Sequence, residues 1–145
     1  WYHCRTGAEQ AAWFIRNVPR DPQALPPLLD MEWNHKSPSC KFRPEPEAVR
    51  AEMQVWLDRV EEAFGKRPII YVTPDFYDEN LRGHFKGYQF FLRTVKEHPA
   101  QRYPGQQWTF WQYSGTGRIP GIKGDADMNV FNGSPDAFRK WLAKN

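Results

Sequence analysis

Short apolar runs alternate with longer amphipathic stretches along this chain of 145 residues. Residues 28–33 and 68–72 are brief and apolar enough to form buried strands. Between them, Val49, Met53 and Val60 recur at helical spacing and belong to one apolar stripe. Strands that alternate with helices favour a mostly parallel sheet joined by crossover helices. The pattern therefore predicts an α/β architecture.

Helix boundary signals agree with this interpretation. Thr6 followed by Glu9 has the spacing of a capping box, in which each side chain bonds the backbone N–H of the other residue. Pro46 suits the first turn of a second helix, and Gly65 suits its end. We predict strands at residues 1–4, 28–33, 67–73, 89–95 and 108–114, and helices that begin near Thr6, Pro46, Thr73 and Ser134. Residues 115–124 are rich in glycine and are predicted to form a loop.

The strand at residues 28–33 ends in two acids, Asp30 and Glu32. Side chains two residues apart in a strand share one face, with their Cα atoms about 6 to 7 Å apart. Two carboxylates at this spacing suit acid/base chemistry on a glycosidic bond. In the plainer interpretation, both acids simply begin a solvated loop. We favour the first, because a buried strand seldom directs two like charges to one side without a use for them.

Composition and charge narrow the classes of function. Hydrophobic residues make up 40% of the chain and charged residues 26%, which is typical of a globular domain, taken here as residues 1–145. The net charge is +3, with Lys and Arg scattered among acids, so no nucleic-acid surface is predicted. No apolar run approaches the roughly 20 residues of a membrane-spanning helix. Gly115 and Gly117 lead into Pro120 rather than into a helix, so no phosphate loop and no cofactor are expected.

The two cysteines, Cys4 and Cys40, leave two interpretations open. Their spacing fits no zinc motif, and two thiols alone make a poor metal site. They are either free buried thiols or the partners of one disulfide, and a disulfide would indicate an oxidising compartment.

Acidic and amide residues alternate at Asp125, Asp127 and Asn129, as they do in calcium-binding loops. An EF-hand loop would require glycine at the place of Val130 and a glutamate further on, and both are missing. We therefore predict a turn or an acid that lines a cleft, and no metal site.

Taken together, these segments resemble the family 25 glycoside hydrolases, the lysozymes often called Chalaropsis-type muramidases. The resemblance depends on the combination of Asp30-Met31-Glu32-Trp33 with Trp111-Gln112-Tyr113, since either motif alone would be weak. The further matching segments are residues 2–3, 68–71, 73–77, 108–114, 121–129 and 130–133. They occur in the order that the family has, and they span nearly the whole chain.

The resemblance implies cleavage of the β-1,4 bond between N-acetylmuramic acid and N-acetylglucosamine in peptidoglycan. By motif position, Glu32 corresponds to the general acid, and Asp30 to the partner carboxylate that holds the acetamido group of the substrate. Asp127 corresponds to a further acid of the cleft. The spacing of Asp30 and Glu32 does not decide between retention and inversion. Retention with assistance from the substrate is implied by the resemblance alone.

Aromatic and polar side chains complete the expected site. The substrate-binding positions are Tyr2, His3, Trp33, Tyr71, Trp111 and Tyr113. Trp33 and Tyr71 are expected to form an apolar wall that raises the pKa of Glu32. Trp111 and Tyr113 share one face of their strand by alternation, opposite the other aromatic residues of that strand. We assign them to the cleft, chiefly on the resemblance.

One departure from the family affects the expected fold. Family members begin with a strand that carries an active-site aspartate, then a second strand and a helix, and the chain lacks this part. A closed eight-stranded β/α barrel usually needs about 200 residues or more. We therefore predict an irregular TIM-like (β/α) barrel that is incomplete at its N-terminus, as the C-terminal two-thirds or so of the domain. The strand edges left unpaired would invite self-association.

Two further functions stay open. The missing first-strand aspartate favours a non-catalytic remnant that binds cell walls, whereas the presence of Asp30 and Glu32 favours an enzyme. A glycosidase that acts on chitin-like polymers is the other alternative. Peptidoglycan is the expected partner, and we expect a secreted, periplasmic or wall-associated protein whose signal peptide lies outside this sequence.

Overall fold

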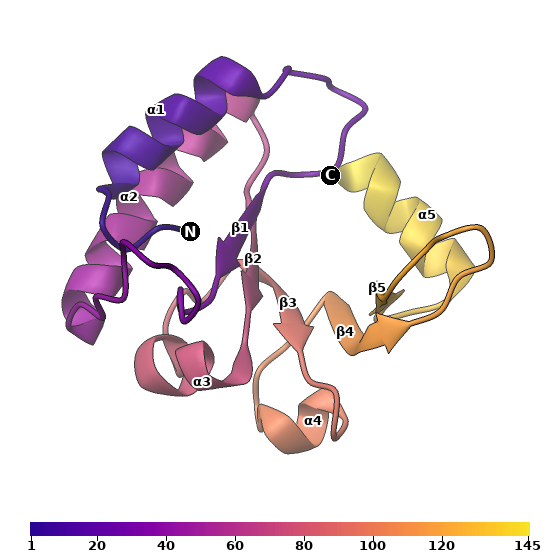
Figure 1. Ribbon diagram of the computed structural model, residues 1–145. Coiled ribbons are helices and arrows are strands. Elements are labelled where there is room, and N and C mark those ends of the chain that lie inside the picture. Colours follow the sequence, from indigo (N-terminus) through magenta and orange to yellow (C-terminus); the bar gives the residue numbers. More distant parts are fainter.

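The computed structural model describes all 145 residues, and its centre is a five-stranded sheet with the order β1-β2-β3-β4-β5 (Figure 1). The strands are β1 (Leu28–Met31), β2 (Ile69–Val72), β3 (Gln89–Arg93), β4 (Phe110–Gly117) and β5 (Ala126–Phe131). The first four strands pair in parallel, and β5 pairs antiparallel to β4. The predicted α/β fold with a mostly parallel sheet is confirmed, and β1 and β5 are the edges of an open, incomplete barrel.

The helices begin and end at the residues that carry the boundary signals. They are α1 (Gly7–Asn17), α2 (Pro46–Phe64), α3 (Pro74–Phe76), α4 (Pro99–Arg102) and α5 (Pro135–Lys144), and a π-helical turn, η1 (Tyr77–Leu81), follows α3. Thr6 and Glu9 form the predicted capping box at the start of α1. Gly65 ends α2 in the left-handed conformation, with φ of 66°, which glycine adopts without steric cost.

The core lies between one face of the sheet and the long helices. Leu29 and Met31 of β1 are buried on this face, next to Ile70 and Val72 of β2. The apolar stripe of α2 is also buried and belongs to the same cluster. Figure 1 shows α1 and α2 side by side on this flank of the sheet. Since alternate residues of β1 are committed to this core, Asp30 must face the opposite, open side of the sheet.

Several elements differ from the sequence prediction. Strand β4 begins at Phe110 rather than at residue 108 and runs to Gly117, so residues 115–117 belong to a strand rather than to the predicted loop. Residues 1–4 form no strand, because the chain turns there and the backbone N–H of Arg5 bonds the carbonyl of Tyr2. The first strand ends at Met31, before Trp33. Helix α4 and strand β5 were not expected from the sequence. Strand β5 forms a hairpin with β4, and this pairing, rather than an apolar run of its own, makes residues 126–131 a strand.

Gly7 marks a close approach of α1 to α2, and we expect Gly7→Ala to destabilise the fold. A Cβ atom at this position would lie 2.0 Å from the backbone carbonyl oxygen of Glu52. The Gly7 N–H also donates a 2.5 Å hydrogen bond to the Glu52 carboxylate, so the two helices are in direct contact at this point. Overpacking of this kind costs about 1–3 kcal/mol. Urea denaturation measures the loss, and an unchanged midpoint would show that the helices separate freely.

Candidate active site

A cavity of about 440 Å³ opens on the face of the sheet that the long helices leave uncovered. Its wall includes Asp30 and Glu32 from the end of β1, Tyr71 from β2, Gln112 from β4 and Asp127 from β5. A volume of this size falls within the range of roughly 300–1,000 Å³ that small-molecule sites occupy. The cavity thus gathers side chains from strand ends that are far apart in the sequence, as parallel β/α sheets do at their binding sites.

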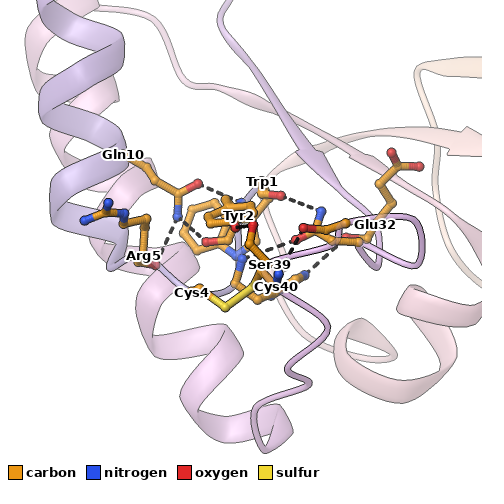
Figure 2. Close-up of a disulfide and its surroundings, with 11 residues drawn as sticks. Trp1, Tyr2, Cys4, Arg5, Gln10, Glu32, Ser39 and Cys40 are labelled. Atoms are coloured by element: carbon orange, nitrogen blue, oxygen red, sulfur yellow. Dashed lines mark hydrogen bonds between the residues drawn. A yellow bond between two sulfur atoms is a disulfide. The ribbon is translucent and has the colours of Figure 1, made fainter.

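The acid pair lies on one side of this cavity. Leu29 and Met31 face the core, so Asp30 and Glu32 point the other way. Figure 2 shows the side chain of Glu32 extending away from the neighbouring disulfide, while its backbone stays close to the N-terminal segment. Asp30 and Glu32 remain open to solvent at the mouth of the cavity. The acids are therefore accessible to a ligand rather than sealed inside the fold.

The surroundings of the pair make both acids hold protons more tightly. Partial burial raises the pKa of Asp30. Partial burial also raises the pKa of Glu32, and the negative charge of Asp30 raises it further, while the positive charge of Arg93 opposes this shift. Both carboxyl groups thus keep a proton to higher pH than a free acid, and Glu32 has the neighbouring carboxylates of Asp30 and Asp75 as additional causes. A carboxyl group with a raised pKa suits the role of general acid.

Tyr71, on strand β2 next to β1, also lines the cavity. Its hydroxyl donates a 2.5 Å hydrogen bond to the side-chain oxygen of Gln112, a buried residue of β4. Burial, followed by the charge of Asp30, raises the pKa of Tyr71 far above its ordinary value. The hydroxyl therefore stays protonated and acts as a hydrogen-bond donor, with no role as a base near neutral pH.

Three predicted site residues lie behind the cavity rather than in it. Trp33 is 5% exposed, and its indole N–H donates to the Glu79 carboxylate at 3.0 Å. The ring of His3 packs against Trp33 at 4.7 Å, and its Nε2 lies 3.1 Å from the backbone carbonyl of Glu32. The hydroxyl of Tyr2 is 2.7 Å from the hydroxyl of Ser39. His3 and Trp33 support the strand end that carries the acid, and burial lowers the pKa of His3.

Trp111 and Tyr113 also lie outside the cavity. The indole N–H of Trp111 donates to the carbonyl of Thr94 at 2.8 Å, and its ring packs against Trp108 and His98. Tyr113 is 40% exposed beside Trp111. Alternation over the predicted strand 108–114 puts its other aromatic residues, Trp108 and Phe110, opposite Trp111. Strand β4 begins only at Phe110, so alternation does not apply to Trp108. The cavity receives Gln112 from this strand instead.

A disulfide joins Cys4 to Cys40 and ties the N-terminal segment to the loop that follows the acids (Figure 2). The same segment bonds this loop through the side-chain amide of Asn34, which donates to the carbonyl of Trp1 at 3.0 Å. Gln10 of α1 holds the segment from its other side through the backbone of Tyr2. The disulfide therefore fastens the layer that supports Glu32 from behind.

Sequence reasoning missed several residues of the cavity wall. They are Leu28, Phe91, Arg93, Gln112, Gly115 and Asn129. Arg93 had a detectable signal, because it is a charged residue at the end of an apolar strand, two positions after Phe91 and on the same face. Asn129 stands two residues after Asp127 and follows the same rule in β5. Gly115 offered no such signal, since its contribution is the space that a side chain would occupy.

The structure contains no group of three or more His, Cys, Asp or Glu side chains arranged to hold a metal ion. None of its helices has the length and apolar character needed to cross a membrane. The cavity wall carries carboxyl, phenol, amide and guanidinium groups.

We expect Asp30→Asn to stabilise the fold at pH 7 and to leave its stability unchanged near pH 3. The pKa of Asp30 is higher in the folded chain than its ordinary value of 3.8. A carboxyl group with a raised pKa opposes folding when it is ionised, so its cost is absent below pH 3.8 and is complete above the folded pKa. Urea denaturation at the two pH values measures the difference. Glu62→Gln, on an exposed position of α2, serves as the control for charge removal.

An equal effect of Asp30→Asn at both pH values would contradict the raised pKa. A loss of stability at pH 7 would show that the carboxylate is held favourably by contacts that the cavity geometry does not suggest.

Carboxyl groups gathered at the carboxyl ends of strands in a β/α sheet are the arrangement found in β/α-barrel glycosidases. A family model described as "Glycosyl hydrolases family 25" matches residues 1–122 of the chain. The chain belongs to this family, and the resemblance seen in its sequence is confirmed.

Known relatives agree with this assignment. The protein YegX of Escherichia coli (strain K12), described as uncharacterized, is 35% identical over 136 residues, which cover 92% of this chain and 46% of that protein. Lysozyme M1 of Streptomyces globisporus is 31% identical over 141 residues, with coverage of 89% and 46%. The structure of a family 25 glycosyl hydrolase from Bacillus anthracis matches with a TM-score of 0.77 and 33% identity, over 94% of this chain and 63% of that one. The chain spans about half the length of the curated relatives it matches.

Proposed function

We propose that the chain acts as an N-acetylmuramidase, which cleaves the β-1,4 bond between N-acetylmuramic acid and N-acetylglucosamine in peptidoglycan. The single observation that carries the proposal is the pair Asp30 and Glu32 on one wall of a cavity that also receives Asp127. Membership of the glycosyl hydrolase family supports the reaction class, and the lysozyme among the relatives supports the substrate.

In the proposed mechanism, Glu32 donates its proton to the oxygen that leaves with the departing sugar. Partial burial and the charge of Asp30 both raise the pKa of Glu32, which keeps it protonated at higher pH than a free glutamate. Asp30 stays ionised and holds the 2-acetamido group of the sugar, whose oxygen then attacks the anomeric carbon. This route gives a retaining outcome, and it rests on the family resemblance rather than on the distance between the acids.

We further propose that the chain works outside the cytoplasm, at the cell wall. The disulfide between Cys4 and Cys40 supports this location, because disulfides persist in oxidising compartments. A peptidoglycan substrate requires the same location.

A second candidate function is binding to the wall without cleavage. The observation that favours it is that these 145 residues cover 46% of Lysozyme M1 and 63% of the Bacillus anthracis structure. On their own they would keep the cavity and bind the wall without cleaving it.

Two assays on the 145-residue chain separate these functions. Clearing of a suspension of purified bacterial walls reports cleavage, and co-sedimentation with insoluble peptidoglycan reports binding. The muramidase proposal predicts clearing, whereas sedimentation without clearing would assign the chain to the binding remnant. Release of reducing ends from chitin oligomers, with none from walls, would replace both proposals by a chitin-directed glycosidase.

A further inference from the structure

Arg93 is the one cationic side chain in the wall of the cavity. It stands at the end of β3, where its backbone carbonyl accepts a 2.5 Å hydrogen bond from the hydroxyl of Tyr103. Tyr103 is fully buried, so this contact anchors the strand end in the core. The base of the arginine is thus fixed, and its guanidinium projects over the open face of the sheet beside Phe91.

The guanidinium of Arg93 has no partner within the protein. The eight ion pairs of the chain use other residues, and the only hydrogen bond at Arg93 outside the sheet goes to its backbone carbonyl. Three carboxyl groups share the cavity with it, and none of them forms an ion pair with it. An arginine with its N–H groups unused in a cavity is equipped to bind oxygen atoms of a ligand, since it can only donate.

Gly115 provides the space for that ligand. A Cβ atom at position 115 would lie 3.8 Å from Nη2 of Arg93 and 3.5 Å from Oδ1 of Asp127. Any larger side chain would enter the gap between the Arg93 guanidinium and the Asp127 carboxylate. The absence of a side chain therefore leaves one end of the cavity open next to Arg93.

The backbones that carry Arg93 and the acid pair lie two strand spacings, or about 10 Å, apart, because β2 separates β3 from β1. When a glycosidic bond lies at Glu32, the guanidinium therefore meets a substituent of the polymer rather than the reacting bond. Arg93 is the cation of the cavity that can accept a carboxylate, across the gap at Gly115 from Asp127.

We propose that Arg93 binds the lactyl group of a muramic acid unit, through the oxygen atoms of its carboxyl carbon. This inference rests on the proposed muramidase function and names the feature of the substrate that the cavity selects. Every muramic acid carries this ether-linked group, as a free carboxylate in glycan stripped of peptides and as an amide carbonyl in intact peptidoglycan. The sugars of chitin have no equivalent. Arg93 is thus a specificity residue that distinguishes wall polymer from chitin.

The test compares the binding of two tetrasaccharides to the full chain in a Glu32→Gln background, which prevents turnover. One is the alternating N-acetylglucosamine and N-acetylmuramic acid tetrasaccharide with free lactyl carboxylates, and the other is chitotetraose. Isothermal titration calorimetry gives the dissociation constants of each sugar for the parent protein with Arg93 and for its Arg93→Met and Arg93→Lys variants. Arg16→Met, an exposed arginine on α1 with no contact to the cavity, is the matched control.

We expect Arg93→Met to weaken binding of the muramyl tetrasaccharide by about tenfold or more, because a charge-assisted bidentate contact is lost. The dissociation constant for chitotetraose should be unchanged. For the muramyl tetrasaccharide, the dissociation constant of Arg93→Lys should fall between those of the parent and Arg93→Met, and that of Arg16→Met should equal the parent's. An equal loss for both sugars, or no loss, overturns the role of Arg93 and leaves the muramidase proposal standing. Competition by a free stem peptide would assign the arginine to peptide carboxylates and also overturns it. If the parent protein binds neither sugar, the proposed function itself fails.

Discussion

Glu32→Gln is expected to lower the rate of wall cleavage by about 100- to 10,000-fold, the usual contribution of a general acid. Glutamine keeps the size of the side chain and removes the proton that the leaving oxygen needs. Since Glu32 is open to solvent and its side chain forms no hydrogen bond that holds the fold, the variant should unfold at the same urea concentration as the parent or at a higher one. Release of soluble fragments from purified walls measures the rate.

Two controls separate the loss of the general acid from a loss of surface charge and from a loss of binding. Glu62→Gln removes an exposed carboxylate from α2 and should clear walls at the parent rate. Binding of Glu32→Gln to insoluble peptidoglycan should persist, because the acid acts on the bond rather than on affinity. Turnover close to that of the parent would remove Glu32 from the role of general acid, whatever the cavity looks like.

Replacing Cys4 and Cys40 together by alanine is expected to lower the free energy of unfolding by about 4 kcal/mol. The reason is chain entropy, since the disulfide closes a loop across a sequence separation of 36 residues and restricts the unfolded chain. Cys40 is also 1% exposed, so its side chain sits in packed surroundings. Urea denaturation without reductant measures the difference between the parent and the double variant.

Reduction of the parent protein should reproduce the effect, and reductant should not change the double variant. If the parent keeps its stability after full reduction, then contacts such as those of Gln10 and Asn34 hold the N-terminal segment without the disulfide. The same treatment reports on the site, because the segment reaches the backbone of Glu32 through His3. Wall clearing should fall with reduction in the parent and not in the double variant.

Local signals in the sequence predicted the long helices well. The capping box of Thr6 and Glu9, Pro46 at the first turn and Gly65 at the end of α2 are short-range features, and the structure has all of them. Strand β5 was missed because residues 126–131 carry Asp127 and Asn129 and lack an apolar run. It forms by pairing with the preceding strand β4, in which Gly117 lies opposite Ala126 at the loop end of the hairpin.

The site was predictable where strand alternation applies and unpredictable where it does not. Alternation in β1 sent Asp30 and Glu32 to the same side, as the structure has them. It fixes only relative faces, and so could not say that Trp111 faces away from the cavity while Gln112 faces into it. Trp33 was expected to form an apolar wall with Tyr71, yet it lies past the end of β1 and is buried in the core cluster.

The sugar at the newly formed chain ends shows whether Glu32 protonates the bond that follows a muramic acid unit. Purified peptidoglycan would be digested with the parent chain and with Glu32→Gln, and the soluble fragments analysed by mass spectrometry after reduction. We expect fragments that end in reduced N-acetylmuramic acid with the parent and essentially none with the variant. Fragments that end in reduced N-acetylglucosamine, or equal release by both proteins, would contradict it.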